Sequence, residues 1–265
     1  MYQPLVSIVT IVYNGEQYLE QAIQSVLQQT YPAIEYIIID GGSKDKSVDI
    51  IKKYQSHLAY WISEKDKGVS DAFNKGIAKA KGEIIGLINA DDWYEPYAVE
   101  KIVDAIKEAD VAYGDLQYWK SDKKDMIVIG DHNFLVNEMS VNHPSVFVKS
   151  SCYKKYGTFK SNFKYAMDYD LMLRLKMNRC SFVHVPGVLA NMRWEGISDQ
   201  QWHKACKEAL LIKNIYFPNK AFLNNLYFHK QTTSIKLGRF LNRMHLNGTV
   251  RFYRRWLSPI KKRYD

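Results

Sequence analysis

Residues 5–14 read Leu-Val-Ser-Ile-Val-Thr-Ile-Val-Tyr-Asn, an apolar and β-branched run that ends in a polar turn. A continuous run of this kind is typical of a strand that is buried on both faces. Apolar residues then recur at helical spacing over 19–27, and a second apolar run over 35–39 ends at Asp40. A strand, a helix and a strand in this order predict right-handed βαβ units and a mostly parallel sheet.

The alternation of strands and helices continues along the chain. Residues 120–165 are mixed and loop-rich, whereas 170–178 predict a helix and 182–186 a strand. We therefore predict an α/β fold that is followed, from residue 200 onward, by a helical and basic segment. Before residue 119 we also expect helices over 48–54, 70–80 and 98–108 and strands over 60–63, 83–89 and 111–118, the last at the edge of the sheet.

The composition narrows the class of protein. Of the 265 residues, 46% are hydrophobic and 25% are charged, as in globular rather than disordered proteins. The 37 Lys and Arg exceed the 28 Asp and Glu, and this net charge of +9 favours nucleic acid, an anionic membrane or a phosphate-rich substrate as a partner. Three scattered cysteines argue against a disulfide framework and structural zinc. Without a signal-peptide pattern or ~20 consecutive apolar residues, we expect a cytoplasmic protein.

Polar residues follow three of the predicted strands, as Tyr13-Asn14, Asp40-Gly41-Gly42 and Asn89-Ala90-Asp91-Asp92. Ligands of parallel sheets bind beyond the carboxyl ends of the strands, so these residues predict a site. The adjacent carboxylates of Asp91 and Asp92 suit a divalent cation whose shell is completed by waters and substrate phosphates. Asp92 is alternatively the N-cap of a helix that begins near Tyr94. Asp40 and its glycines suit a base or ribose, or form an ordinary turn.

Two further segments suit either a functional or a structural role. Residues 64–76 open a helix with polar side chains, which predict nucleotide and phosphate contacts or a solvated helix start. Asp168 and Asp170 lie in the first turn of a predicted helix. A carboxylate in that position accepts a proton from a hydroxyl group or simply opposes the helix dipole.

Together these segments resemble the family 2 glycosyltransferases, which have the GT-A fold. The resemblance covers about residues 5–200 and implies one catalytic domain over 1–199, with a nucleotide-binding half over about 1–118 and an acceptor-binding half over about 119–199, before the C-terminal segment 200–265. The motifs that carry it are Val6-Ser7-Ile8-Val9-Thr10-Ile11-Val12-Tyr13-Asn14, Ser25-Val26-Leu27-Gln28-Gln29-Thr30-Tyr31, Glu35-Tyr36-Ile37-Ile38-Ile39-Asp40-Gly41-Gly42-Ser43, Asn74-Lys75-Gly76, Asp91-Asp92 and Met167-Asp168-Tyr169-Asp170.

The resemblance also implies an activity. Such an enzyme moves a sugar, with inversion, from a nucleotide diphosphate sugar, most often a UDP-sugar, to a hydroxyl of a glycan or lipid-linked acceptor, here during assembly of a bacterial surface polysaccharide. Asp91 would hold Mn²⁺ or Mg²⁺ with Asp92 beside it, and Asp168 would be the general base. The residues implied for donor binding are Thr10, Val12, Tyr13, Asp40, Gly41, Asp66, Asn74, Lys75, Asn89, Ala90 and Asp91.

The sequence departs from the family pattern at two places. The metal motif usually begins with Asp, but here it begins with Asn89, which lowers the negative charge and predicts weaker metal binding. Many relatives carry His in the segment that matches residues 192–198, where this chain has none. Arg193 from that segment, together with His143 and Asp170, is a candidate contact to the acceptor or a phosphate, and His143 is alternatively a hydrogen-bonded structural residue.

The end of the chain mixes cations with apolar side chains. This pattern predicts an amphipathic helix at an anionic membrane surface, or else a solvated helix packed on the domain. No recognised nucleic-acid module is present, so we expect no nucleic-acid partner. The cations after Ser234 are Lys236, Arg239, Arg243, Arg251, Arg254, Arg255, Lys261, Lys262 and Arg263, and the apolar residues among them are Leu237, Phe240, Leu241, Met244, Phe252, Trp256 and Leu257.

Two other functions stay open at this point. A sugar-nucleotide pyrophosphorylase also uses an open α/β sheet, but its Gly-rich, Arg-bearing N-terminal loop is replaced here by Tyr13-Asn14-Gly15. A degenerate, membrane-associated scaffold is favoured by Asn89, whereas Asp91 and Asp168 favour an enzyme.

Overall fold

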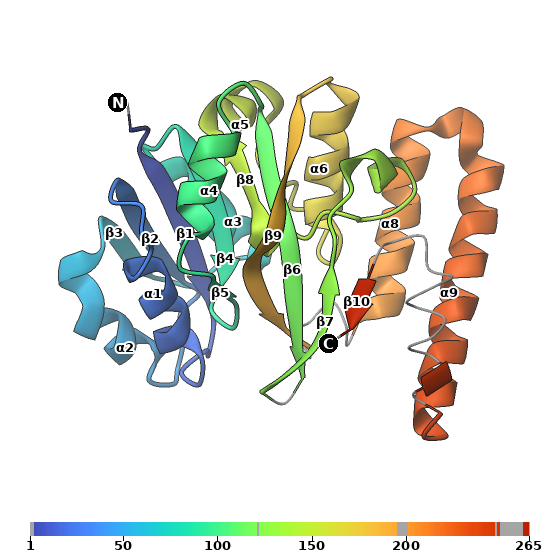
Figure 1. Cartoon of the computed structure of the whole chain (residues 1–265), viewed down its shortest axis with the longest axis horizontal. Helices are drawn as coiled ribbons and strands as arrows, with labels where there is room; N and C mark the ends of the chain where they lie inside the picture. The colour runs from blue at the N-terminus through green and yellow to red at the C-terminus, as the bar shows by residue number, and fades with distance from the viewer. Residues whose placement is uncertain (1–2, 121, 195–200, 247, 250–261, 265) are drawn as a thin grey trace.

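In the computed structural model, which describes residues 3–120, 122–194, 201–246, 248–249 and 262–264, the sheet is built around strand β1 (Val6–Val12) (Figure 1). β1 lies between β2 (Ile34–Asp40) and β4 (Ile84–Asn89), and β3 (Tyr60–Ser63) pairs with β2. All three pairings are parallel. The polar residues that follow β1, β2 and β4 are therefore brought to one edge of the sheet, as predicted.

Every residue of β1 is buried, and its side chains alternate between two apolar cores. Val9 and Ile11 pack in the core that is shared with α3 (Val69–Lys79) and α6 (Met167–Met177). Ile8 and Val12 pack in the opposite core, which is shared with α1 (Leu19–Leu27), α2 (Ser47–Tyr54) and α4 (Ala98–Ala105). Helices on both faces explain the continuous apolar run of residues 5–12.

The second half of the sheet departs from the expected arrangement. The strand expected at the edge over 111–118 is wrong in its position, because β6 (Val111–Lys120) has neighbours on both sides. It pairs in parallel with β9 (Phe182–Arg193) and antiparallel with β7 (Lys123–Val128) and β8 (Val146–Lys149). Residues 120–165, expected to be loop-rich, thus supply two strands, along with α5 (Ser150–Tyr156).

The alternative role of Asp92 as a helix N-cap is also wrong. The residues that follow it form β5 (Trp93–Tyr94), which pairs antiparallel with β9, and α4 begins only at Ala98. Asp92 thus lies between the end of β4 and the start of β5. Helix capping does not explain why its carboxylate is buried.

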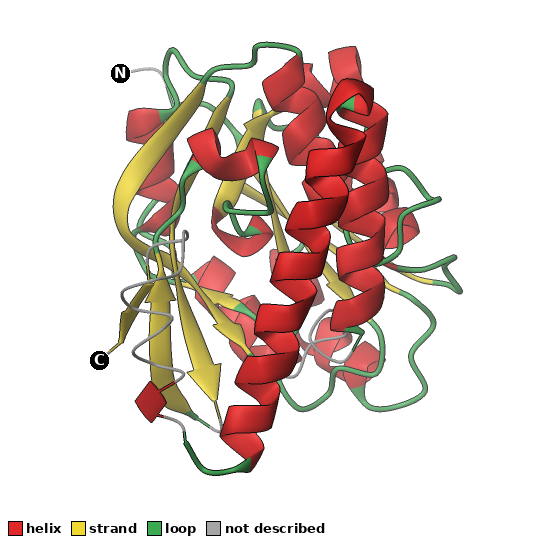
Figure 2. Cartoon of the chain, turned by 90° about the vertical axis from the view of Figure 1, so that its right-hand side faces the viewer, coloured by secondary structure: helices red, strands yellow, loops and turns green. Residues whose placement is uncertain are grey.

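Two long helices follow the sheet, α8 (Trp202–Tyr216) and α9 (Ala221–Arg243). Figure 1 shows α8 between the sheet and α9, and Figure 2 shows the two helices side by side. Lys262 and Arg263 lie in β10 (Lys262–Tyr264), which pairs antiparallel with β7, so an amphipathic helix does not extend to them. Arg251, Arg254, Arg255, Lys261, Phe252, Trp256 and Leu257 lie outside the described residues. No helix in the described ranges is long and apolar enough to cross a membrane.

Candidate active site

The turns after β1 and β2 hold each other in place. The backbone N–H of Asn14 donates to Ser43 Oγ at 2.8 Å, and Lys44 N–H donates to Asn14 Oδ1 at 2.9 Å. Asn14 adopts a left-handed backbone conformation with φ of 50°, which asparagine tolerates better than most residues. The two turns therefore form one continuous polar rim at the strand ends.

Asp40 is buried at the end of β2 and organises the turn that follows it. Its carboxylate accepts hydrogen bonds from the backbone N–H groups of Gly42 and Ser43 at 3.1 and 3.0 Å, from Ser63 Oγ at 2.6 Å, and from Ser43 Oγ. A buried carboxylate is stable only when its oxygens are satisfied in this way. The side chain of Asp40 thus shapes the loop that carries Gly41.

Three of the residues expected to bind the donor meet at Gly41. A Cβ atom at this position would lie 2.4 Å from Asp66 Oδ2 and 3.5 Å from Tyr13 Cδ2, so only glycine lets the Asp66 carboxylate lie so close to the backbone. Asp66 Oδ1 accepts a hydrogen bond from Gly68 N–H at 2.8 Å. The Tyr13 side chain is 63% exposed. An exposed ring beside a fixed carboxylate offers a stacking surface and an acceptor to a planar base.

Four other residues expected at the donor are engaged by the protein itself. Thr10 is buried and shares a hydrogen bond of 2.9 Å with the hydroxyl of Tyr36, and Val12 is buried as well. Asn74 donates to the carbonyl of Phe159 and accepts from its N–H, at 2.8 and 2.9 Å. Lys75 Nζ lies 2.8 Å from a carboxylate oxygen of Glu64. The amide of Asn74 thus ties α3 to the segment before Asp168.

The acidic motif after β4 places one carboxylate at the surface and one inside. Asp92 is 2% exposed, and its Oδ2 accepts from Asn89 Nδ2 at 3.0 Å, whereas Asp91 is partly exposed and Ala90 is buried. Burial raises the pKa of Asp91, and burial together with the neighbouring Asp91 charge raises that of Asp92 well above its usual range. A partly exposed and a buried carboxylate side by side are an arrangement that a divalent cation would stabilise.

The protein alone offers few ligands for such a cation. No group of three His, Cys, Asp or Glu side chains within the described ranges could hold a metal ion. Mg²⁺ and related ions in nucleotide sites are commonly held by one or two carboxylates with substrate phosphates and waters. The pair fits an ion of this kind, with Asp91 as the accessible ligand and Asp92 behind it.

Arg193, at the end of β9, is packed against the same loop. Its guanidinium donates to the backbone carbonyl of Asp91 at 2.7 Å and to Gln21 Oε1 at 2.6 Å. It also lies over the rings of Tyr18 and Trp93, at 3.9 and 4.4 Å from their centroids. Arg193 therefore fixes the acidic loop and brings a positive charge beside it.

His143 and Asp168 come together from segments that are far apart in the chain. His143 Nδ1 lies 4.0 Å from Asp168 Oδ2, and its Nε2 lies 3.2 Å from Asn89 Nδ2. Burial lowers the pKa of His143 to about 4 and raises that of Asp168 to about 6. A polar chain thus runs from Asp92 through Asn89 and His143 to Asp168. A carboxylate with a pKa of about 6 is well suited to accept a proton near neutral pH.

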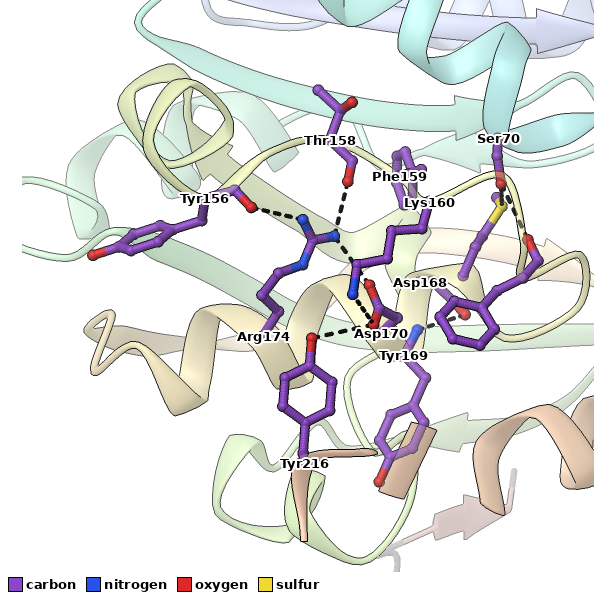
Figure 3. Close-up of polar contacts among 12 residues, drawn as sticks. Ser70, Tyr156, Thr158, Phe159, Lys160, Asp168, Tyr169, Asp170, Arg174 and Tyr216 are labelled. Atoms are coloured by element: carbon purple, nitrogen blue, oxygen red, sulfur yellow. Dashed lines mark hydrogen bonds and ion pairs between the residues drawn. The ribbon is translucent and has the colours of Figure 1, made fainter. Parts of the chain in front are cut away.

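Asp170, expected to contact an acceptor or a phosphate, is instead fully buried in an ionic network (Figure 3). Its carboxylate lies 3.1 Å from Lys160 Nζ and 3.1 Å from Arg174 Nη2, and Tyr216 donates to it at 3.2 Å. The Arg174 guanidinium also donates to the backbone carbonyls of Tyr156 and Thr158, at 2.7 and 2.8 Å. Asp170 therefore has no exposed surface for a ligand and holds together the loop that precedes Asp168.

Glu208, on α8, supports the site and was not predicted from the sequence. Its carboxylate accepts from the backbone N–H groups of Lys164, Tyr165 and Ala166, at distances between 2.7 and 3.1 Å. These donors lie just before α6, so Glu208 fixes the entry to the helix that carries Asp168. One signal was present, because Glu208 is the last acidic residue before Asp265 in a basic segment.

The sequence is similar to those of known proteins. The sequence matches the family described as Glycosyl transferase family 2 over residues 7–169. An uncharacterized glycosyltransferase of Rickettsia typhi, RT0329, is 31% identical over 204 residues, which cover 69% of this chain and 62% of that protein. The uncharacterized glycosyltransferase Rv1514c of Mycobacterium tuberculosis is 30% identical, covering 75% of this chain and 78% of its own length. Escherichia coli chondroitin synthase is 30% identical, covering 65% of this chain but 26% of the synthase.

Solved structures agree at the level of the fold. S. aureus TarS 1–349 in complex with UDP-GlcNAc has a TM-score of 0.65 at 16% identity, covering 96% of this chain and 76% of that one. The mannosyltransferase PcManGT of Pyrobaculum calidifontis, in complex with GDP-Man and Mn²⁺, has a TM-score of 0.64 at 16% identity, covering 86% and 71%. The chain spans about three fifths of the length of the Rickettsia typhi and Rickettsia prowazekii relatives that it matches. With the family match over more than half of its length, the chain belongs to glycosyl transferase family 2 and has the GT-A fold.

Proposed function

We propose that this enzyme transfers a sugar from a UDP-sugar to a hydroxyl acceptor by a single displacement that inverts the anomeric carbon. The observation that carries the proposal is the polar chain Asp92–Asn89–His143–Asp168. It links a carboxylate pair suited to a cation with a carboxylate suited to proton transfer. Leaving-group stabilisation and deprotonation of the acceptor are needed on opposite sides of the same sugar carbon.

The two ends of this polar chain of side chains have different roles. Asp91, with Asp92 behind it, would hold Mn²⁺ or Mg²⁺, which stabilises the negative charge of a departing diphosphate when it is bound. Asp168 takes the proton of the acceptor hydroxyl as the hydroxyl oxygen forms the new bond to the anomeric carbon. No covalent bond between the sugar and the protein is required. Replacing Asp168 by asparagine tests this role, because an amide oxygen cannot serve as the base.

The rim supports a nucleotide donor, and one similar fold favours UDP, whereas the sugar stays open. Tyr13 and Asp66 lie side by side at the rim, where a planar base would find a ring and a carboxylate acceptor for its N–H. TarS is similar in fold and was solved with UDP-GlcNAc, whereas PcManGT was solved with GDP-Man and Mn²⁺. The likeness to chondroitin synthase supports a glycan acceptor in polysaccharide assembly. A lipid-linked acceptor would bring the enzyme to a membrane.

The positive charge of the protein lies in the part that would meet such a membrane. Residues 1–208 contain 25 Lys and Arg and 27 Asp and Glu, whereas residues 209–264 contain 12 Lys and Arg and no acidic residue. On α9 and at the residue that follows it, apolar side chains more than half exposed recur on one side, at Phe222, Leu226, Leu237, Phe240 and Met244. We infer that this side of α9 docks on an anionic lipid surface, with lysines and arginines toward the headgroups.

The double substitution Leu226→Ser and Phe240→Ser tests this docking. We expect it to weaken binding to vesicles of phosphatidylcholine and phosphatidylserine by at least about tenfold, because two large apolar side chains no longer enter the bilayer. Co-sedimentation of purified full-length protein measures the effect, with Leu27→Ser, an exposed leucine on α1, as the matched control. Wild-type binding that is absent, or equally strong on neutral vesicles, would contradict the inference.

A further inference from the structure

His143 occupies the middle of the site, between the acidic loop and Asp168. It begins the short 3₁₀ turn η3 (His143–Ser145), which is anchored by a hydrogen bond from Ser145 Oγ to the Gly114 carbonyl at 2.9 Å. The imidazole and the ring of Phe73 pack in a T-shaped arrangement, with their centroids 5.9 Å apart. Both nitrogens face polar groups, Asn89 on one side and Asp168 on the other.

Asn89 determines which nitrogen of this imidazole carries the proton. Its Nδ2 atom is a pure donor with two N–H bonds, and it lies 3.0 Å from Asp92 Oδ2 and 3.2 Å from His143 Nε2. One N–H bond is directed to each of these acceptors. His143 Nε2 must therefore be the unprotonated nitrogen, and the proton of the neutral ring is on Nδ1, which faces Asp168.

The surroundings keep the imidazole neutral. A small cavity of about 10 Å³ behind the pair is lined by His143 and Asp168 and otherwise by Leu87, Val146, Val148, Tyr153, Phe159, Leu171 and Met172. Burial among such groups lowers the pKa of His143, so the ring carries a single proton at neutral pH. A neutral ring with a fixed proton is a hydrogen-bond donor of defined direction.

On the side of Asp168, one carboxylate oxygen is already fixed and the other faces the histidine. Oδ1 accepts from the N–H of Tyr169 at 2.8 Å, and Oδ2 lies 4.0 Å from His143 Nδ1. We propose that His143 is the positioning residue of the base: its Nδ1–H orients Oδ2 of Asp168, and Asn89 holds the histidine in the required tautomer. This rests on the proposed role of Asp168. The gap exceeds a hydrogen bond by about 1 Å. Catalytic hydrogen bonds are often long in the free enzyme and shorten in the complex with substrate.

The proposal gives a physical reason for asparagine at position 89. An aspartate there would place a carboxylate oxygen opposite His143 Nε2. It would draw the proton to Nε2 and turn the lone pair of Nδ1 toward Asp168. Asn89 instead supplies the N–H that only one tautomer accepts. The departure from the usual first residue of the acidic motif thus serves the base.

The tautomer can be measured directly on the wild-type protein. Full-length protein labelled with ¹⁵N-histidine is examined by long-range ¹H–¹⁵N NMR at neutral pH, and the His143 ring is assigned by its absence in His143→Asn. We expect the pattern of a neutral ring that is protonated on Nδ1. A ring protonated on Nε2, or on both nitrogens, would overturn the proposal whether or not Asp168 is the base. Turnover that survives Asp168→Asn would instead overturn the proposed function.

Two substitutions separate positioning from packing. The amide nitrogen of His143→Asn can take the place of Nδ1, whereas the side chain of His143→Gln reaches the place of Nε2. We expect His143→Gln to lower kcat by about 100-fold with donor Kd unchanged. His143→Asn should lower kcat by only about tenfold. Equal losses in the two variants would contradict a positioning role.

The pH profile of these variants adds a readout that packing alone would not change. An N–H directed at a carboxylate stabilises its ionised form, so its loss raises the pKa of the base. The acidic limb of kcat should therefore move to higher pH in His143→Gln and stay near the wild-type position in His143→Asn. Glu208, a charged group that raises the pKa of Asp168, is unchanged in both variants. An acidic limb that does not move in His143→Gln would contradict the proposal.

Discussion

Asp168→Asn should lower sugar transfer by a factor of about 10² to 10⁴ or more and leave donor binding intact. The amide has the shape of the carboxylate but cannot take the proton from the acceptor hydroxyl. Asp168 lies on α6, whereas the acidic loop after β4 is at the other end of the polar chain through Asn89 and His143. The nucleotide end of the site should therefore not sense the substitution.

Turnover and donor affinity are measured on the same preparations. Turnover is followed by release of nucleoside diphosphate, and affinity by calorimetry. Wild-type kcat should decline as the pH falls through about 6, because the pKa of Asp168 is raised to about 6 by burial and only its ionised form is the base. If Asp168→Asn retained near-normal turnover, Asp168 would not be the base.

Asp170→Asn, two residues away, should instead lower the free energy of unfolding. Asp170 is fully buried and forms ion pairs with Lys160 and Arg174. Removing one partner of a buried ionic network leaves uncompensated charge, at a cost of about 3–5 kcal/mol in the free energy of unfolding. Arg174 would remain largely buried and would hold the Tyr156 and Thr158 carbonyls without its counter-ion.

The two substitutions are matched, because each exchanges one carboxylate for an amide in the first turn of α6. Urea denaturation at neutral pH measures the free energy of unfolding of both variants. Asp168→Asn should not lower it, because burial disfavours the charge of Asp168 in the folded protein. A midpoint for Asp170→Asn equal to that of the wild type would show that the network does not stabilise the fold.

The strands of the parallel half could be predicted from the sequence because burial on both faces leaves a continuous apolar run. β1, β2 and β4 all carry such runs, and each is followed by the polar residues that gather at the site. The position of Asp168 in the first turn of a helix could be predicted for a local reason as well, because apolar residues follow it at helical spacing. Local patterns of this kind are strong enough to place the rim of a site.

The rest depends on partners that are distant in the chain. β7 and β8 are short and pair with strands outside residues 120–165, including β6 and β4, so this segment carries no strong pattern of its own. Asp92 looks like a helix cap until β5 and β9 pair beside it. The contact of His143 with Asn89 spans 54 residues, and that of Glu208 with Ala166 spans 42. Local sequence propensities do not predict such long-range contacts.

Calorimetric titration of the wild-type protein with UDP and GDP, each with and without Mn²⁺, tests the central claim most directly. We expect binding of UDP that depends on Mn²⁺ and is weakened in Asp91→Ala, since Asp91 is the accessible carboxylate of the pair. A preference for GDP would keep the glycosyltransferase but contradict the proposed donor. Absence of binding to either nucleotide would contradict the proposed donor site and favour a scaffold.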